Sequence, residues 1–194
     1  QREITPDEDI DWKPSDEGMA VESPNRIRLV LETFKNKLFT EIFPELNDQG
    51  EKRTVVPKTL IFAKSDAHAE TIVRIVREVF NKGDAFAAKI TYTAQNPEDL
   101  INRLRTSPEL RIAVTVDMVA TGTDVKPLEC VIFMRDVKSG TYFEQMKGRG
   151  VRVIDDTDFR AVTPDAEAKE RFVIVDAVGV TESELVDTVP LDRK

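Results

Sequence analysis

The chain has 194 residues, 40% of them hydrophobic, which is enough to bury one substantial core, and its formal net charge is −8. This acidity argues against nucleic-acid binding through a broad basic surface, so any DNA contact must be local. The single cysteine, Cys130, excludes an internal disulfide. No apolar run approaches the roughly 18 residues of a membrane span, and the acidic amino terminus does not resemble a signal peptide, so we expect a cytoplasmic protein without membrane contact.

Residues 1–22 are interpreted as an acidic arm or linker, because eight acidic side chains and few apolar ones cannot bury enough surface to order themselves. An amphipathic helix is predicted over 24–42, where apolar residues recur at helical spacing after Ser23 as N-cap and Pro24 in the first turn. Pro44 and a polar turn at 47–50 end it. Residues 23–56 therefore form a connecting helix and turn.

From residue 57 on, short apolar runs alternate with helical patterns. Strands are predicted at 59–63, 88–92, 111–116, 130–134 and 172–176, and helices at 66–80 and from about 97 and 141. This alternation is typical of βαβ units, and a continuously apolar strand such as IAVTV is typical of a parallel sheet covered on both faces. The prediction is a doubly wound α/β lobe over 57–178, followed at 179–194 by a tail or the start of the next domain.

The predicted helix TYFEQMKGRGVRV, at 141–153, opens with a capping box and carries Gln145, Arg149 and Arg152 on one face. Gly148 lies on that face, and a glycine in a helix interior costs about 1 kcal/mol relative to alanine. Close approach of a phosphate or another backbone would offset that cost, and two guanidinium forks suit phosphate oxygens. The alternative is that both arginines lie on a solvated helix face.

The stretch RIAVTVDMVATGTD, at 111–124, is a buried strand followed by a loop in which Gly122 can adopt a left-handed conformation. We expect this loop and Asp124 at the carboxyl ends of the strands, where open α/β sheets bind ligands. Alone, Asp124 could equally be a loop cap before Pro127. The strand TLIFA with Lys64 and Ser65 is a weaker candidate, because strand, polar loop and helix follow one another in any α/β unit.

Gln145, Gly148, Arg149 and Arg152 resemble motif VI of superfamily two helicases, the stretch from Asp117 to Asp124 resembles motif V, and Lys64 and Ser65 lie in a segment that resembles motif IV. The amino-acid sequence of residues 20–178 resembles that of the restriction (R) subunit of type I restriction-modification enzymes. The resemblance includes the stretches KTLIFAKSDAHAETIVRIVREVF and VIFMRDVKSGTYFEQMKGRGVRVI.

This resemblance implies a RecA-like second lobe whose arginines contact ATP held by a first lobe, with Asp124 bonding the ribose and Gly122 shaping the turn. Val116 stands where many helicases place a threonine that contacts nucleic acid. Thr115 should point to the other face of its strand, so Thr121 or main-chain amides are the expected substitutes.

The implied partners are the first RecA-like lobe and nuclease domain of the same subunit, the modification and specificity subunits, and double-stranded DNA. ATP and Mg²⁺ would be held mainly by the first lobe, since the chain lacks a Gly-x-x-x-x-Gly-Lys-Ser/Thr loop. We therefore expect no ATP hydrolysis and no DNA cleavage by this chain alone. His68, the single histidine, cannot form a multi-histidine metal site, and Asp155, Asp156 and Asp158 are interpreted as a solvated loop.

Two alternatives stay open. The motifs fit a helicase lobe of another superfamily two enzyme, such as a repair or remodelling protein. They also fit a non-catalytic module in which the arginine helix binds a phosphorylated or acidic partner. The sequences flanking this chain in its parent protein would discriminate among the three readings.

Overall fold

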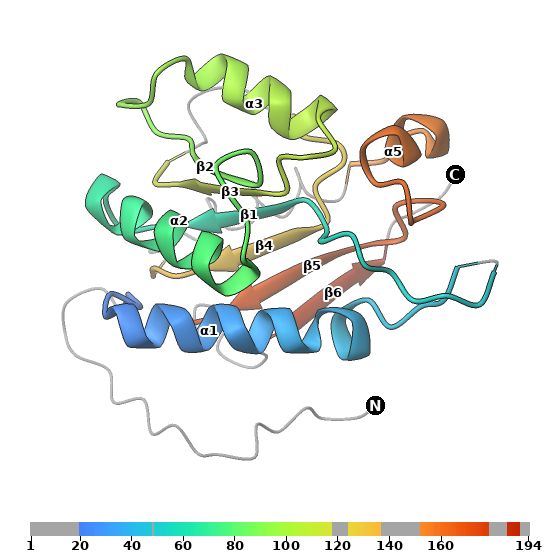
Figure 1. The fold of residues 1–194 in the computed structure, drawn as a ribbon, viewed down its shortest axis with the longest axis horizontal. Coiled ribbons are helices and arrows are strands. Elements are labelled where there is room, and N and C mark those ends of the chain that lie inside the picture. The colour runs from blue at the N-terminus through green and yellow to red at the C-terminus, as the bar shows by residue number, and fades with distance from the viewer. Residues whose placement is uncertain (1–19, 48, 118–123, 137–151, 179–185, 191–194) are drawn as a thin grey trace.

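The computed structural model describes residues 20–47, 49–117, 124–136, 152–178 and 186–190, and Figure 1 shows how these segments assemble around one sheet. The described sheet has six strands in the order β2-β3-β1-β4-β5-β6. Their bounds are β1 Thr59–Phe62, β2 Ala87–Lys89, β3 Ile112–Thr115, β4 Cys130–Phe133, β5 Arg171–Asp176 and β6 Val186–Pro190. The first five pair in parallel and β6 is antiparallel to β5, so the predicted mainly parallel α/β fold is confirmed.

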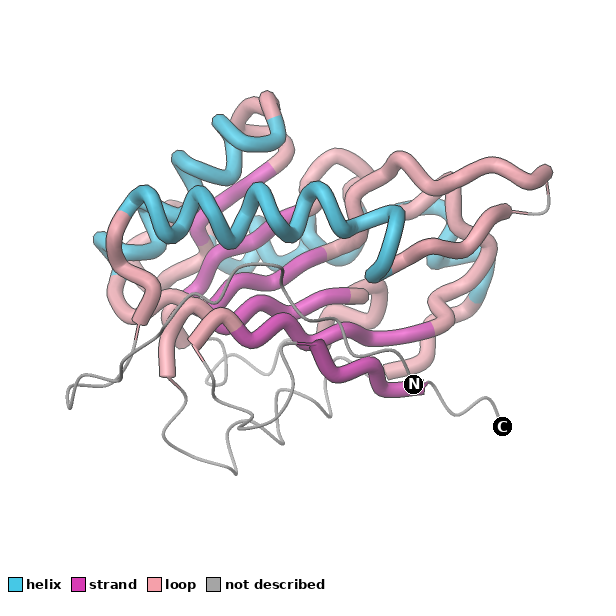
Figure 2. Tube along the Cα trace, turned by 90° about the horizontal axis from the view of Figure 1, so that it is seen from below, coloured by secondary structure: helices cyan, strands magenta, loops and turns pink. Residues whose placement is uncertain are grey.

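Helices cover both faces of the sheet. α1 (Pro24–Lys37) and α2 (Asp66–Phe80) pack together on one face, where α1 lies over the strands when the molecule is seen from below (Figure 2). α3 (Pro97–Thr106) covers the other face and contacts α5 (Asp156–Val162). Successive strand residues divide between the two cores, as Ile61 joins the α1 and α2 side while Phe62 joins the α3 side. This two-sided burial explains why the strands are apolar throughout.

The N-cap predicted for the first helix is present, and the second helix is capped in the same way. Ser23 Oγ accepts a hydrogen bond from the Arg26 N–H at 3.3 Å, and Ser65 Oγ accepts one from the His68 N–H at 3.2 Å. α1 gives way to a π-helical turn at Leu38–Ile42, closed by the Phe43 N–H donating to Leu38 O at 2.8 Å. The wider turn places residue i+5 over residue i, which allows both Leu38 and Phe43 to be buried.

Two predicted elements differ in the structure. The strand predicted at 88–92 ends at Lys89, because the chain turns and the Thr91 and Thr93 hydroxyls bond to Asp66 instead of continuing along the strand. The three acidic side chains at 155, 156 and 158 are exposed, as predicted, but they do not lie in a loop: Asp155 is the N-cap of α5, its Oδ1 accepting from the Thr157 N–H at 2.8 Å. Carboxylates at a helix N-terminus are favoured by its unpaired N–H groups, a signal that the sequence contained.

The ends of the lobe extend further than the sequence suggested. In the stretch interpreted as an arm, Ala20 bridges to Arg135, and Val21 is fully buried with its N–H donating to Met134 O at 2.9 Å. The connecting helix α1 belongs to the same core as α2. Residues 186–190, expected in a tail or a following domain, add β6 to the sheet. The division of the parent protein into domains stays a prediction.

Candidate nucleotide-contacting site

Asp124 and Arg152 lie side by side, although Asp124 precedes β4 in the chain and Arg152 follows it. Arg152 Nη1 is 3.8 Å from Asp124 Oδ2, with side-chain exposures of 58% and 35%. At that separation the pair is looser than a hydrogen bond, and exposed ion pairs of this kind contribute at most about 1 kcal/mol. Little therefore holds the Arg152 guanidinium away from an incoming anion.

Asp124 also has an unused acceptor. Its Oδ1 is buried and has no hydrogen-bond partner within the part of the chain that the structure describes. A buried carboxylate oxygen without a donor is costly, so a donor brought by a ligand or by another segment would be favoured there. A ribose hydroxyl is one such donor, so the residues present fit a nucleotide.

Long basic side chains hold the backbone around this pair. Arg105, in the last turn of α3, donates from Nε to Asp124 O at 2.7 Å. Lys169, just before β5, donates from Nζ to Lys126 O at 2.8 Å and to Arg152 O at 3.0 Å. No sequence motif pointed to Arg105 or Lys169, because a lone basic residue outside a periodic pattern gives no signal.

Asp124 does not lie at the edge of the sheet where the sequence predicted it. The sequence placed it at the carboxyl ends of the strands, but its described neighbours belong to the segments that lead into β3, β4 and β5, at the amino edge of the sheet. The physical reason is the parallel pairing of β4, since the chain must return to the amino edge before Cys130 starts that strand. Asp117 follows β3 directly and does lie at the carboxyl edge.

Five of the predicted site residues lie outside the described residues. They are Thr121 and Gly122 of the strand-to-loop stretch, and Gln145, Gly148 and Arg149 of the predicted arginine helix. Their roles stay predictions.

The residues proposed for nucleic acid have other partners or are buried. Lys64 Nζ forms an exposed ion pair with Glu22 at 2.5 Å, and Ser65 is the N-cap of α2. Thr115 is buried, and its hydroxyl has no partner among the described residues, whereas Val116 packs toward the α1 and α2 side. That the Thr115 side chain points to the opposite face stays a prediction from strand alternation.

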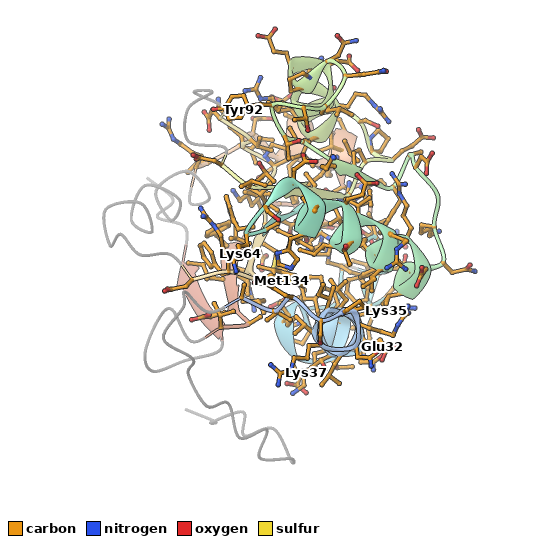
Figure 3. All side chains as sticks on the ribbon, turned by 90° about the vertical axis from the view of Figure 1, so that its left-hand side faces the viewer. Glu32, Lys35, Lys37, Lys64, Tyr92 and Met134 are labelled. Atoms are coloured by element: carbon orange, nitrogen blue, oxygen red, sulfur yellow. The ribbon has the colours of Figure 1, made fainter. Side chains whose placement is uncertain are left out.

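A polar network fixes the chain after β2. Asp66 Oδ1 accepts hydrogen bonds from the Thr91 and Thr93 hydroxyls, both at 2.6 Å, and Asp66 Oδ2 accepts one from Lys89 Nζ at 2.8 Å. These hydrogen bonds hold the pKa of Asp66 far below its usual value, and the bond from Lys89 has the largest effect. The network leaves Tyr92 projecting outward, and Figure 3 shows it on the same side of the molecule as Lys64.

His68 is buried at the start of α2. The Lys64 N–H donates to His68 Nδ1 at 3.0 Å, so the ring proton lies on Nε2, which donates to Val21 O at 2.7 Å. Burial lowers the pKa of His68, although the bond to the Val21 carbonyl opposes this shift. His68 thus joins β1, α2 and Val21, which is a structural role.

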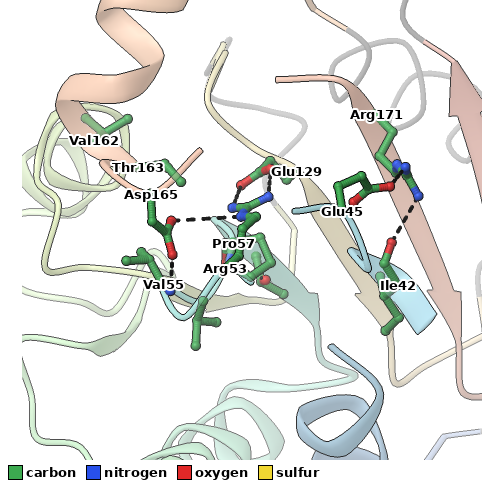
Figure 4. Close-up of polar contacts among 12 residues, drawn as sticks. Ile42, Glu45, Arg53, Val55, Pro57, Glu129, Val162, Thr163, Asp165 and Arg171 are labelled. Carbon is green, nitrogen blue, oxygen red and sulfur yellow. Dashed lines mark hydrogen bonds and ion pairs between the residues drawn. The ribbon is translucent and has the colours of Figure 1, made fainter. Parts of the chain in front are cut away.

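A buried ionic cluster, whose polar contacts are drawn in Figure 4, lies at the amino edge of the sheet. Its residues line a cavity of about 110 Å³. Arg53 donates two hydrogen bonds to Glu129, at 2.8 and 3.0 Å, and Asp165 accepts from the N–H groups of Thr54 and Val55. Burial alone would lower the pKa of Arg53, but the charge and hydrogen bonds of Glu129 raise it. The cluster joins the turn after α1 to β4 and β5, which is a structural role.

Among the described residues there is neither a membrane-spanning helix nor a metal-binding cluster. No helix there is long and apolar enough to cross a membrane. No group of three or more His, Cys, Asp or Glu side chains there could hold a metal ion.

The helicase conserved C-terminal domain model matches residues 35–154, a range that includes β1 to β4 and both members of the Asp124–Arg152 pair. The chain therefore belongs to this family. Among solved structures, domain 2 of the DEAD-box helicase Mss116p, bound to an RNA duplex, matches with a TM-score of 0.50 and 19% identity, over 68% of this chain and 46% of that chain. This likeness concerns the fold alone, and with the family match it confirms a RecA-like helicase C-terminal lobe.

The chain is also similar in sequence to two subunits of type I restriction enzymes. The type I restriction enzyme EcoKI endonuclease subunit of Escherichia coli (strain K12) is 30% identical over 190 residues, covering 92% of this chain and 15% of that subunit. The EcoAI endonuclease subunit of Escherichia coli is 28% identical over 163 residues, covering 76% of this chain and 19% of that subunit. The predicted relationship to type I restriction subunits is confirmed as distant homology. The chain spans less than a fifth of the length of these relatives.

Proposed function

We propose that this chain is the second motor lobe of an ATP-dependent DNA translocase in a type I restriction endonuclease. The observation that carries the proposal is homology to a type I endonuclease subunit over 92% of the chain. The neighbouring Asp124 and Arg152 support it, because they belong to the two motifs that helicase lobes present to a nucleotide. The first lobe, the nuclease domain, and the modification and specificity subunits would complete the enzyme.

In this proposal the chain contributes two interactions to ATP bound between the lobes. The Asp124 carboxylate, with its unpartnered Oδ1, accepts a hydrogen bond from a ribose hydroxyl. Arg152, together with Arg149 of the predicted arginine helix, presents planar forks to the phosphoryl group being transferred. Charge spreads over that group's oxygens as the bond breaks, and a guanidinium supplied across a cleft stabilises it. Mg²⁺ and the β and γ phosphates would be held by the first lobe.

The DNA contact is proposed at the carboxyl edge of the sheet, after β1 and β3. The exposed Lys64 lies there, yet it is already paired with Glu22, and Ser65 and Thr115 have structural positions. We therefore favour Thr121 and main-chain amides of the segment after β3 as the groups that contact the phosphate backbone. Such sparse contacts agree with the acidic composition of the chain.

The test is the Arg152→Ala substitution in the complete polypeptide, with DNA-stimulated ATP hydrolysis and translocation as the measurements. The expected loss is about 10³- to 10⁵-fold, as for arginines supplied to phosphoryl transfer in related enzymes. Arg152→Lys should recover little, because an ammonium lacks the planar fork. Arg160→Ala is the matched control, since Arg160 is an exposed arginine on α5 with no contact to Asp124 or Arg152 in the described structure. ATP hydrolysis by Arg152→Ala at the level of this control would refute the proposal.

A further inference from the structure

Lys169 is a buried lysine that joins the two segments of the candidate site. It is only 4% exposed, and its Nζ donates to Lys126 O and Arg152 O. Lys126 lies two residues after Asp124, so one ammonium group is bonded to the backbone on each side of the Asp124–Arg152 pair. Its Nζ also lies 6.0 Å from the centre of the Phe172 ring, a cation–π contact that fixes the stem of the side chain.

Burying the Lys169 ammonium group lowers the stability of the folded lobe through the loss of its hydration. Burial removes the Lys169 ammonium group from water, and two of its hydrogen bonds go to neutral carbonyl oxygens. Burial lowers the pKa of Lys169 to about 8, against the opposing influence of Glu129 and Asp124. A methionine of similar length would fill the space with a smaller desolvation cost, but it would not join Lys126 O to Arg152 O.

We propose that Lys169 is a positioning residue of the nucleotide-contacting site: by tying Arg152 O to Lys126 O, it fixes the separation between the Arg152 guanidinium and the Asp124 carboxylate. This inference rests on the proposed function. The Asp124–Arg152 pair is too loose to hold its own geometry, and Arg105 anchors the Asp124 carbonyl but makes no described contact with Arg152. Lys169 provides the link between the two segments that the ion pair does not.

Without that link, the backbone at Arg152 can drift relative to Asp124. Displacements of about 1 Å in a site for phosphoryl transfer cost up to about 10²-fold in rate. Ground-state nucleotide binding depends mainly on the first lobe in the proposed function, so it should change much less. The signature of Lys169 is therefore a loss of kcat with little change in KM for ATP.

The test compares Lys169→Met with Lys58→Met in the complete polypeptide. Lys58 is the matched control, because it is also a fully buried lysine whose Nζ donates to backbone carbonyls, those of Ser107 and Leu110, with no contact to Asp124 or Arg152 in the described structure. Lys169→Met should lower kcat of DNA-stimulated ATP hydrolysis by about 10- to 100-fold per folded molecule, with KM for ATP within about threefold. Lys58→Met should leave kcat per folded molecule within about twofold, whatever its melting temperature. Lys169→Gln, which keeps a shorter neutral donor, replaces Lys169→Met if that variant does not fold.

A double substitution separates positioning from general stability. If Lys169 acts through Arg152, then Lys169→Met should have no further effect on the residual single-turnover rate of Arg152→Ala, because no guanidinium is left to position. An unchanged kcat in Lys169→Met and Lys169→Gln, or full additivity with Arg152→Ala, would overturn the inference. Failure of the proposed function has a different signature, since Arg152→Ala alone would then hydrolyse ATP normally.

Discussion

His68 joins three segments of the chain through one neutral imidazole. Nδ1 accepts from the backbone at the end of β1, Nε2 donates to Val21 O, and the ring belongs to the first turn of α2. If Nδ1 were protonated, it would become a donor facing the Lys64 N–H, which is also a donor, and the hydrogen bond between them would be lost. The docked position of Val21, and with it the entry of the chain into α1, therefore depends on the ionisation state of this one residue.

We predict that the stability of the chain falls below about pH 6.5 because of His68. The pKa of folded His68 lies below its usual value of 6.5, so the unfolded chain binds a proton first as the pH falls. The stability that the neutral ring contributes is present above about pH 6.5 and is lost as the pH falls through the folded-state pKa. Urea unfolding from pH 8 to pH 5 measures this, and His68→Gln, which cannot titrate, should show a shallower decline. Equal declines in both proteins would show that other groups cause the acid sensitivity.

Among single residues, the sequence singled out both members of the Asp124–Arg152 pair, and their assignment to two motifs of one site stays a prediction. The edge of the sheet on which Asp124 lies was predicted wrongly, because the residues between β3 and Asp124 reverse the chain without a periodic signal. Lys169 and Arg105 could not be predicted, since a buried lysine and an exposed one look alike in sequence.

At the scale of elements, cap signals made the helices predictable. Ser23 with Pro24, and Ser65, mark the beginnings of α1 and α2, and the Asp66–Phe80 bounds of α2 match the prediction. The helix ends where Asn81 adopts a left-handed conformation, with φ 51°. β2 was predicted too long because threonines favour strands, and only the tertiary contact with Asp66 shows that they turn here.

We predict that α1 is essential to the fold of the lobe. Leu31 is fully buried in the core that α1 shares with α2, whereas Leu29, on the same helix, is 46% exposed. Leu31→Ala should lower the free energy of unfolding by about 2–5 kcal/mol, through lost burial and the cavity it leaves. The matched Leu29→Ala change should stay within about 0.5 kcal/mol. Chemical denaturation of both variants provides the measurement, and equal effects would mean that α1 is a dispensable connector.

In the proposed function, the whole molecule is a lobe that provides one side of a shared site. We predict that the isolated chain does not hydrolyse ATP above background, with or without duplex DNA, since it contains no Gly-x-x-x-x-Gly-Lys-Ser/Thr loop to hold the β and γ phosphates. A steady-state phosphate-release assay measures this, with Arg152→Ala as the control for contaminating ATPases. Turnover that disappears in Arg152→Ala would belong to the chain and would contradict the prediction.

We propose that Arg152 acts on the transition state of ATP hydrolysis from across the cleft between two lobes. The most direct measurement is the affinity of the complete polypeptide, with duplex DNA present, for ADP–aluminium fluoride and for a non-hydrolysable ATP analogue. In Arg152→Ala, the affinity for the aluminium fluoride complex, which mimics the phosphoryl group in transfer, should fall by about 10²-fold or more, while that for the ATP analogue changes by less than about threefold. Equal losses for both ligands, or no loss for either, would contradict this account.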